Sequence, residues 1–368
     1  MRLFVLLNRL LTLGMIWRRV DSMKALVKCR AEKGLELQDI PIPEVKPGTV
    51  LVKIAAAGIC GSDHHIYKWD DGRNALSNNV PYILGHEGSG TVEKVGEGVT
   101  NIAEGDRVAF ESHIHDDCSY VKRGLENICP HKSILGIGSN GVFAEYALVP
   151  QHIVRIAPLS IPLTVASVFE PATIGIRALE HLSELLSKQP LGRKSKVAVF
   201  GATGIMGGVA ALAARWFGFD VLAFGRSKEK LAVISSLDSS ITTYDITDVD
   251  ISKKLSELSV DAVIETTGAP QSLEIGRSLI VSAGVWIQIG IFGSDSDAYR
   301  ILLNDVVRRE IMLKGVVGRT RREWNRLFDL VGSGALQLTP LITDRYALED
   351  FEAAFRAKEG IKSVFVLE

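Results

Sequence analysis

The apolar positions of the chain follow two different patterns. Between Met23 and about Pro150, short apolar runs of strand length are separated by glycine and proline. Such spacing predicts short strands that form a small, partly open β-barrel. We expect strands of this barrel at residues 25–28, 50–56, 90–96 and 106–110.

After Lys196 the pattern changes to strands that alternate with helices, which predicts a doubly wound parallel sheet. The predicted fold class is therefore α/β, with a β-barrel region followed by a parallel-sheet region. The expected strands lie at 196–200, 220–224, 260–265 and 285–290. The expected helices are 208–217, a helix that follows the T-T-G turn at 266–268 and ends at about 281, and 298–309.

A glycine-rich turn joins the first strand of the second region to a helix. Its sequence, G-A-T-G-I-M-G at 201–207, directly follows the apolar run at 196–200. Such a turn lets backbone N–H groups and a helix N-terminus face a pyrophosphate, so it predicts a dinucleotide site. The residues expected to contact the cofactor are Gly201, Thr203, Gly204, Ile205, Met206 and Gly207.

Loops at the carboxyl ends of the later strands extend this site, because doubly wound sheets bind their ligands at that edge. We expect these loops to hold the nicotinamide. The residues concerned are Thr266, Gly268, Gly290, Ile291 and Phe292.

The residues after the second strand of this region bear on the choice of cofactor. Enzymes that use NAD usually carry Asp or Glu there, which accepts hydrogen bonds from the ribose 2′-hydroxyl. Here the chain has Gly225, Arg226 and Ser227, with Lys230 shortly after. An arginine and a hydroxyl suit a 2′-phosphate, which a carboxylate would repel. The sequence therefore favours NADP(H) over NAD(H).

Two short segments of the first region carry candidate metal ligands. Cys60 offers a thiolate, His86 an imidazole and Glu87 a carboxylate. Zinc prefers these ligand types in catalytic sites that keep one position open. A lone buried cysteine or histidine has an ordinary structural explanation, but the combination, with Glu170 later in the chain, favours a metal site.

Composition limits the classes of partner. A formal net charge of −1 gives no electrostatic reason to expect nucleic acid or a membrane, so we expect a small-molecule substrate. Four scattered cysteines argue against a disulfide framework and for a cytoplasmic location. Residues 1–22 are expected to lie outside the fold, as a misassigned start, a mitochondrial presequence or a poor signal peptide.

The motif G-I-C-G-S-D-H-H at 58–65, followed by G-H-E at 85–87, resembles the zinc-dependent medium-chain dehydrogenases of the alcohol dehydrogenase superfamily. Within that family, the run H-I-Y-K-W-D at 65–70 is most similar to threonine 3-dehydrogenases, with sorbitol and butanediol dehydrogenases as close relatives. The resemblance implies a GroES-like catalytic domain, a Rossmann cofactor domain and a C-terminal return to the catalytic domain. Their expected ranges are 23–175, 176–315 and 316–368.

The resemblance also implies a ligand set for a catalytic zinc. Cys60, His86 and Glu170 would bind the metal, with water or substrate as the fourth ligand. Glu87 would replace the water or lie just behind the metal, and Asp63 would orient His86.

A proton path follows from the same resemblance. Zinc in such a site acts as a Lewis acid toward a substrate hydroxyl. Ser62 would take the proton of that hydroxyl, and His65 would pass it to solvent.

Residues 112–131 occupy the place where many relatives carry a structural zinc lobe. The four ligand positions would be His115, Cys118, Val121 and Cys129. Because valine cannot bind a metal, we expect the structural zinc to be lost. The alternative is a rearranged site that borrows Asp116, Asp117 or His131.

These observations favour a zinc-dependent oxidoreductase that transfers a hydride between NADP(H) and a secondary alcohol, a polyol or a threonine-like hydroxy amino acid. One alternative is a zinc-free NADPH quinone or enoyl reductase of the same superfamily. Another is a non-catalytic NADPH-binding protein. By resemblance, a homodimer or homotetramer is expected.

Overall fold

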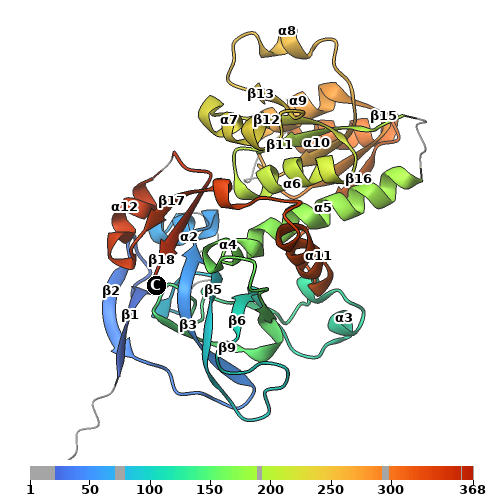
Figure 1. The fold of residues 1–368 in the computed structure, drawn as a ribbon. Coiled ribbons are helices and arrows are strands. Elements are labelled where there is room, and N and C mark those ends of the chain that lie inside the picture. The colour runs from blue at the N-terminus through green and yellow to red at the C-terminus, as the bar shows by residue number, and fades with distance from the viewer. Residues whose placement is uncertain (1–20, 71–78, 189–192, 292–297, 358, 368) are drawn as a thin grey trace, which may run out of the picture.

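The structure is a computed structural model that describes residues 21–70, 79–188, 193–291, 298–357 and 359–367. Its strands form two main sheets, in the lower and upper halves of Figure 1, and the long helix α5 (Phe169–Ser187) runs between them. The strands of the second sheet alternate with helices, as the sequence pattern predicts, whereas the first sheet contains two strands longer than expected, β3 (Thr49–Gly58) and β5 (Glu87–Val95).

The first region is organised around β3 (Thr49–Gly58). Val50, Val52 and Ile54 are buried in one apolar cluster, because alternate side chains of a strand point to the same face. The order of the main sheet is β10 (Val154–Ile156), β6 (Arg107–Phe110), β5 (Glu87–Val95), β3, β18 (Lys362–Val366) and β17 (Ile342–Tyr346), and β9 (Tyr146–Pro150) also pairs with β3.

A smaller sheet completes this region and includes the start of the described chain. The carbonyl of Asp21 accepts a hydrogen bond of 3.0 Å from the N–H of Ile42, so the fold begins before the expected start at Met23. The remaining elements are the sheet β2 (Glu36–Pro41), β1 (Ser22–Lys28) and β4 (Tyr82–Ile83), the pair β7 (His113–Ile114) and β8 (Ser133–Ile134), and the helices α2 (Gly61–Lys68), α3 (Ser119–Lys122) and α4 (Leu163–Ala166).

The second region is the predicted doubly wound sheet, and all of its strands are parallel. Counted from its first strand, the order is the 3-2-1-4-5-6 of sheets that bind dinucleotides. The strands in spatial order are β13 (Thr242–Asp245), β12 (Asp220–Gly225), β11 (Lys196–Phe200), β14 (Val260–Glu265), β15 (Ile280–Gln288) and β16 (Met312–Gly315). The helices are α6 (Ile205–Trp216), α7 (Lys228–Leu237), α8 (Ile251–Leu255), α9 (Pro270–Leu279) and α10 (Ala298–Arg308).

The chain then returns to the first region. Helix α11 (Arg321–Gly332) packs on α5, and α12 (Phe351–Arg356) lies between β17 and β18 in the sequence. Strand β18 pairs antiparallel with β3, with Val364 opposite Gly58. The boundary expected between residues 175 and 176 falls inside α5. That helix approaches α6 so closely that a Cβ on Gly175 would lie 2.8 Å from the carbonyl oxygen of Met206.

Candidate metal and cofactor site

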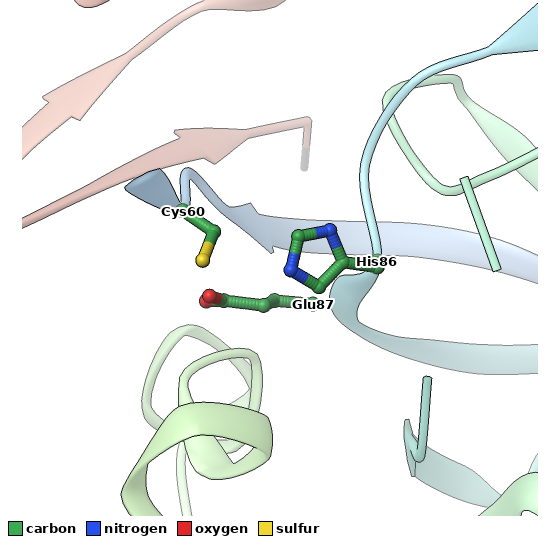
Figure 2. Close-up of side chains that lie close together, drawn as sticks. All are labelled: Cys60, His86 and Glu87. Carbon is green, nitrogen blue, oxygen red and sulfur yellow. The ribbon is translucent and has the colours of Figure 1, made fainter. Parts of the chain in front are cut away.

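Cys60, His86 and Glu87 converge in the first region. Their ligand atoms all lie within 4.8 Å of one another, and Figure 2 shows the three side chains close together. Cys60 follows β3 as the N-cap of α2, and Glu87 is the first residue of β5. The antiparallel pairing of β3 and β5, with Gly58 opposite Glu87, brings the two segments together.

A glycine sets the backbone direction at His86. Gly85 has φ +98°, and a Cβ at this position would lie 2.3 Å from Cδ1 of Phe143. Glycine tolerates both the conformation and the close approach. The turn before β5 therefore presents His86 while Phe143 remains packed in the core.

Asp63 contacts both segments of the converging group. Its Oδ2 accepts a hydrogen bond of 2.8 Å from the N–H of Cys60, and its Oδ1 lies 3.3 Å from Nδ1 of His86. Burial lowers the pKa of His86, but the Asp63 carboxylate outweighs this effect and raises the pKa well above its ordinary value. Because Asp63 engages Nδ1, Nε2 of His86 is the nitrogen left for a metal.

The converging residues fit a zinc ion. The carboxylate of Glu87 is buried; its Oε2 lies beside the Lys362 ammonium, whereas its Oε1 has no hydrogen-bond partner among the described residues. A buried carboxylate oxygen without a partner is costly, so Oε1 remains available to a second cation. A thiolate, an imidazole and a carboxylate are also the ligand types zinc prefers. Cys60, His86 and Glu87 would therefore hold the metal.

Glu170, which was expected to bind the metal together with Cys60 and His86, is outside the converging group. It lies in the first turn of α5, where the hydroxyl of Ser112 donates to its Oε1 at 2.6 Å. The guanidinium of Arg319 forms an ion pair with the same oxygen and donates to the Glu170 carbonyl at 3.2 Å. Glu170 is thus already paired, and the residue that joins Cys60 and His86 in the converging group is Glu87; metal binding by Glu170 stays a prediction.

The two residues expected to relay a proton are placed differently from each other. The hydroxyl of Ser62 lies 3.5 Å from Nε2 of His86, next to the position that a metal would occupy. His65 instead contacts Asp70, with its Nδ1 2.7 Å from Oδ1. Ser62 therefore belongs to the site. His65 lies further along α2, and its ring pairs with the exposed carboxylate of Asp70, which follows the helix.

The glycine-rich turn has the close packing expected of a dinucleotide site. Gly201 has φ +84°, and a Cβ there would lie 2.2 Å from Oγ1 of Thr266. A Cβ on Gly207 would lie 2.2 Å from the carbonyl oxygen of Gly201. Helix α6 begins at Ile205, within the turn, rather than at 208. Ile205 and Met206 thus form its first turn, where free N–H groups can face a phosphate.

The loops expected to hold the nicotinamide contact one another at the ends of β14 and β15. A Cβ on Gly268 would lie 2.3 Å from the carbonyl oxygen of Ile291, and one on Gly290 would lie 2.1 Å from the nitrogen of Gly268. The buried carboxylate of Glu265 accepts from the N–H of Gly268 at 3.0 Å and from the side chain of Gln288 at 2.7 Å. Phe292 lies outside the described residues.

The end of β12 has a glycine, Gly225, where NAD enzymes usually carry an acidic residue, and this glycine packs against Thr203. A Cβ on Gly225 would lie 2.2 Å from Cγ2 of Thr203. Arg226 is exposed beside this contact. The hydroxyl of Ser227 caps α7 by accepting from the N–H of Lys230 at 3.3 Å, and it donates to Glu229 at 2.7 Å. Ser227 is therefore engaged within its own helix, whereas Arg226 is exposed and could reach a 2′-phosphate.

The lobe at 112–131 assembles part of a second ligand group. The sulfurs of Cys118 and Cys129 are 2.9 Å apart, and Oδ1 of Asp116 lies 3.7 Å from the Cys129 sulfur. The other Asp116 oxygen is 3.3 Å from Nδ1 of His131. Asp116, one of the residues that a rearranged zinc site could borrow, is therefore close to both cysteines. The loss of the structural zinc stays a prediction.

Three residues at the site were not found from the sequence. Ser112 and Arg319 bind Glu170, and the ammonium of Lys362 lies 2.5 Å from Oε2 of Glu87. Arg319 and Lys362 come from the C-terminal return, far from the motifs they contact. No local pattern marks them, because their role follows from tertiary pairing.

Two family models match the chain. Residues 46–159 match the alcohol dehydrogenase GroES-like domain, and residues 206–333 match the zinc-binding dehydrogenase domain. These matches identify the first region as a GroES-like domain and the parallel sheet as the Rossmann-like half of such a dehydrogenase.

Full-length relatives give the same result. L-threonine 3-dehydrogenase of Pyrococcus furiosus is 33% identical over 361 residues, which cover 95% of this chain and 99% of the relative. L-threonine 3-dehydrogenase of Bacillus subtilis is 32% identical over a match that covers 91% of this chain and 94% of the relative. The solved structure of 2R,3R-butanediol dehydrogenase from Bacillus subtilis is 26% identical, with a TM-score of 0.80 over 94% of this chain and 100% of its own. The chain therefore belongs to the zinc-dependent medium-chain dehydrogenases of the alcohol dehydrogenase superfamily and is an oxidoreductase.

Proposed function

We propose that this oxidoreductase transfers a hydride from the secondary alcohol of a polyol or hydroxy amino acid, L-threonine foremost, to NADP⁺. The observation that carries the chemistry is the convergence of Cys60, His86 and Glu87 within 4.8 Å. The substrate class rests on the similarity to relatives named L-threonine 3-dehydrogenase.

The residues divide the work of the reaction. When bound, zinc would supply a Lewis acid for the substrate hydroxyl. Asp63 keeps Nδ1 of His86 engaged, so the ring presents Nε2 to the metal position. Ser62, 3.5 Å from that nitrogen, is close enough to take the hydroxyl proton. The turn at 201–207 would bind the cofactor pyrophosphate.

The preference for NADP(H) rests on the end of β12. Gly225 leaves no carboxylate to accept from a ribose 2′-hydroxyl, and Arg226 is an exposed guanidinium at the same place. We expect Arg226→Ala to lower kcat/KM for NADP⁺ about 10- to 100-fold, because a charge-assisted contact contributes roughly 1.5–3 kcal/mol. The turnover with NAD⁺ should change little. Lys253→Ala, which removes an exposed cation on α8, is the matched control.

The first experiment measures zinc per chain by elemental analysis, together with NADP⁺ and NAD⁺ turnover on L-threonine, polyols and simple secondary alcohols. Cys60→Ser should lose one zinc and the activity. Cys29→Ser, which removes a thiol that contacts Val27 and Gln38 and belongs to neither group of candidate ligands, should lose neither.

The outcomes separate the alternatives. A chain without zinc that still reduces quinones or enoyl substrates with NADPH would contradict the zinc-dependent function. A second zinc that survives Cys60→Ser would indicate that the lobe around Cys118 and Cys129 binds a metal. Turnover confined to polyols would leave the zinc chemistry standing and exclude threonine.

We also infer that two copies of the chain associate through the edge of the parallel sheet. Strand β16 is the edge strand beside β15, and Leu303, Val307 and Leu313 expose large apolar side chains on α10 and β16. An open edge with apolar neighbours is suited to pairing with an identical strand. Leu313→Lys should shift the mass in multi-angle light scattering toward a monomer.

Among the described residues, each helix is too short or too polar to span a bilayer.

A further inference from the structure

Lys362 reaches the metal ligands from the last strand of the described chain. The N–H of Ile59 donates to the carbonyl of Ser363 at 3.0 Å, which fixes β18 against the end of β3. Lys362 is only 4% exposed. Its ammonium donates to the carbonyl of Ile59 at 2.8 Å and lies 2.5 Å from Oε2 of Glu87.

Glu87 depends on this ammonium. The carboxylate is fully buried; its Oε1 has no hydrogen-bond partner among the described residues, and its Oε2 is in contact with the Lys362 ammonium. Its Oε2 lies directly over Gly58, where a Cβ would come within 2.2 Å. Lys362 therefore supplies the positive charge in contact with a ligand that would otherwise be buried without compensation.

We propose that Lys362 stands in for zinc at Glu87, keeping this ligand in place before the metal binds and sharing it with the metal afterwards. The proposal rests on the zinc-dependent function proposed above. Lys362 acts through Glu87, so it is a positioning residue. It also competes with zinc, because a fixed ammonium opposes the approach of a second cation to the same carboxylate.

The test compares zinc affinity with the stability of the metal-free protein. Lys362→Met keeps the length of the side chain and removes the charge. It should lower the unfolding temperature of the zinc-free protein, because Glu87 loses its counter-ion. It should also bind zinc about tenfold more tightly, or better, in competition with a chromophoric chelator. Lys362→Arg, which retains the charge, should return both values toward those of the wild type.

Two controls isolate the effect. Lys28→Met removes another fully buried ammonium, which contacts the carbonyls of Glu32 and Gly34 and has no carboxylate of the site beside it. It should lower the unfolding temperature without changing zinc affinity. In a Glu87→Gln background, Lys362→Met should no longer tighten zinc binding.

The results have distinct meanings. Zinc affinity that is unchanged or weaker in Lys362→Met would overturn the competition between Lys362 and zinc, and an unchanged unfolding temperature of the zinc-free variant would overturn the role of Lys362 as the counter-ion of Glu87; either result leaves the zinc site intact. A wild-type chain that binds no zinc would overturn the proposed function itself. If the methionine variant folds only with zinc, the proposal is supported. If it does not fold at all, Lys362→Gln is measured against the same two outcomes.

Discussion

The Asp63 carboxylate lies 3.3 Å from Nδ1 of His86, on the opposite side of the ring from the nitrogen that faces Cys60 and Glu87. Such a partner fixes the orientation of a ligand histidine and increases its basicity. We expect Asp63→Asn to weaken zinc binding about 10- to 100-fold. Chelator competition measures the affinity, and equal affinity in the two proteins would contradict the orienting role.

Thr203 and Gly225 form a matched pair at the cofactor turn. Because a Cβ on Gly225 would lie 2.2 Å from Cγ2 of Thr203, Gly225→Ala should displace the turn and weaken NADP⁺ binding. Thr203→Ser removes the clashing methyl group. The double variant should recover most of the lost affinity, as measured by fluorescence titration of NADPH. If the affinity lost by the double variant equals the sum of the losses of the two single variants, the contact is unimportant.

Glu265 organises the loops at the ends of β14 and β15. Its carboxylate accepts from the N–H of Gly268 and from the side chain of Gln288. In Glu265→Gln an acceptor oxygen is replaced by an NH₂ group, which leaves donors facing donors. We expect a lower unfolding temperature and a raised KM for NADP⁺. The double variant Glu265→Gln/Gln288→Glu exchanges the two groups, and a partial recovery of KM would support the assignment.

A buried ion pair stabilises the catalytic region away from the metal. Arg155 and Glu111 are 9% and 2% exposed, and the guanidinium contacts the Glu111 carboxylate. Arg155→Met leaves that carboxylate buried without its partner and should cost about 3–5 kcal/mol of folding free energy. The double variant Arg155→Met/Glu111→Leu should lose less. The midpoints of thermal unfolding compare the two.

His113 makes stability depend on pH. Burial, reinforced by the charge of Arg319, lowers its pKa to about 2, whereas an unfolded histidine has a pKa of about 6.5. Between these values the unfolded chain binds a proton that the folded chain does not. Stability is therefore highest above pH 6.5 and falls as the pH falls toward 2. In metal-free protein, His113→Asn should flatten the decline of the unfolding temperature between pH 7 and pH 4.5. Parallel curves for the two proteins would contradict this assignment.

The pattern of the sequence predicted the two sheets because their signals are local. The strand at 260–265 coincides with β14, and the run at 196–200 coincides with β11. Strand β13 carries no such signal, because Thr242–Asp245 is a polar edge strand with no fully buried residue, and neither an apolar run nor a clear alternation marks it. The sequence pattern puts the start of α6 too late, because the first turn of this helix is rich in glycine.

The candidate site was only partly predictable. Cys60, His86 and Glu87 lie in two short motifs, so their chemistry was visible in the sequence. The partners of the carboxylates were not, because Arg319 is 149 positions from Glu170, and Lys362, which pairs with Glu87, lies on the last described strand. Only the tertiary structure shows that Glu170 is already engaged by Ser112 and Arg319. The domain boundaries, the location in the cell and the structural zinc stay predictions.

The pairing of β18 with β3 has a consequence for biosynthesis. One half of β3 pairs with β9, but Ala56–Gly58, next to Cys60, pairs with β18. The parallel sheet of the cofactor region is continuous in the chain from β11 to β16, so a nascent polypeptide can complete it before β18 is made. The edge of β3 beside the metal ligands remains open until translation reaches β18, and in that interval it is a template for wrong strand pairing.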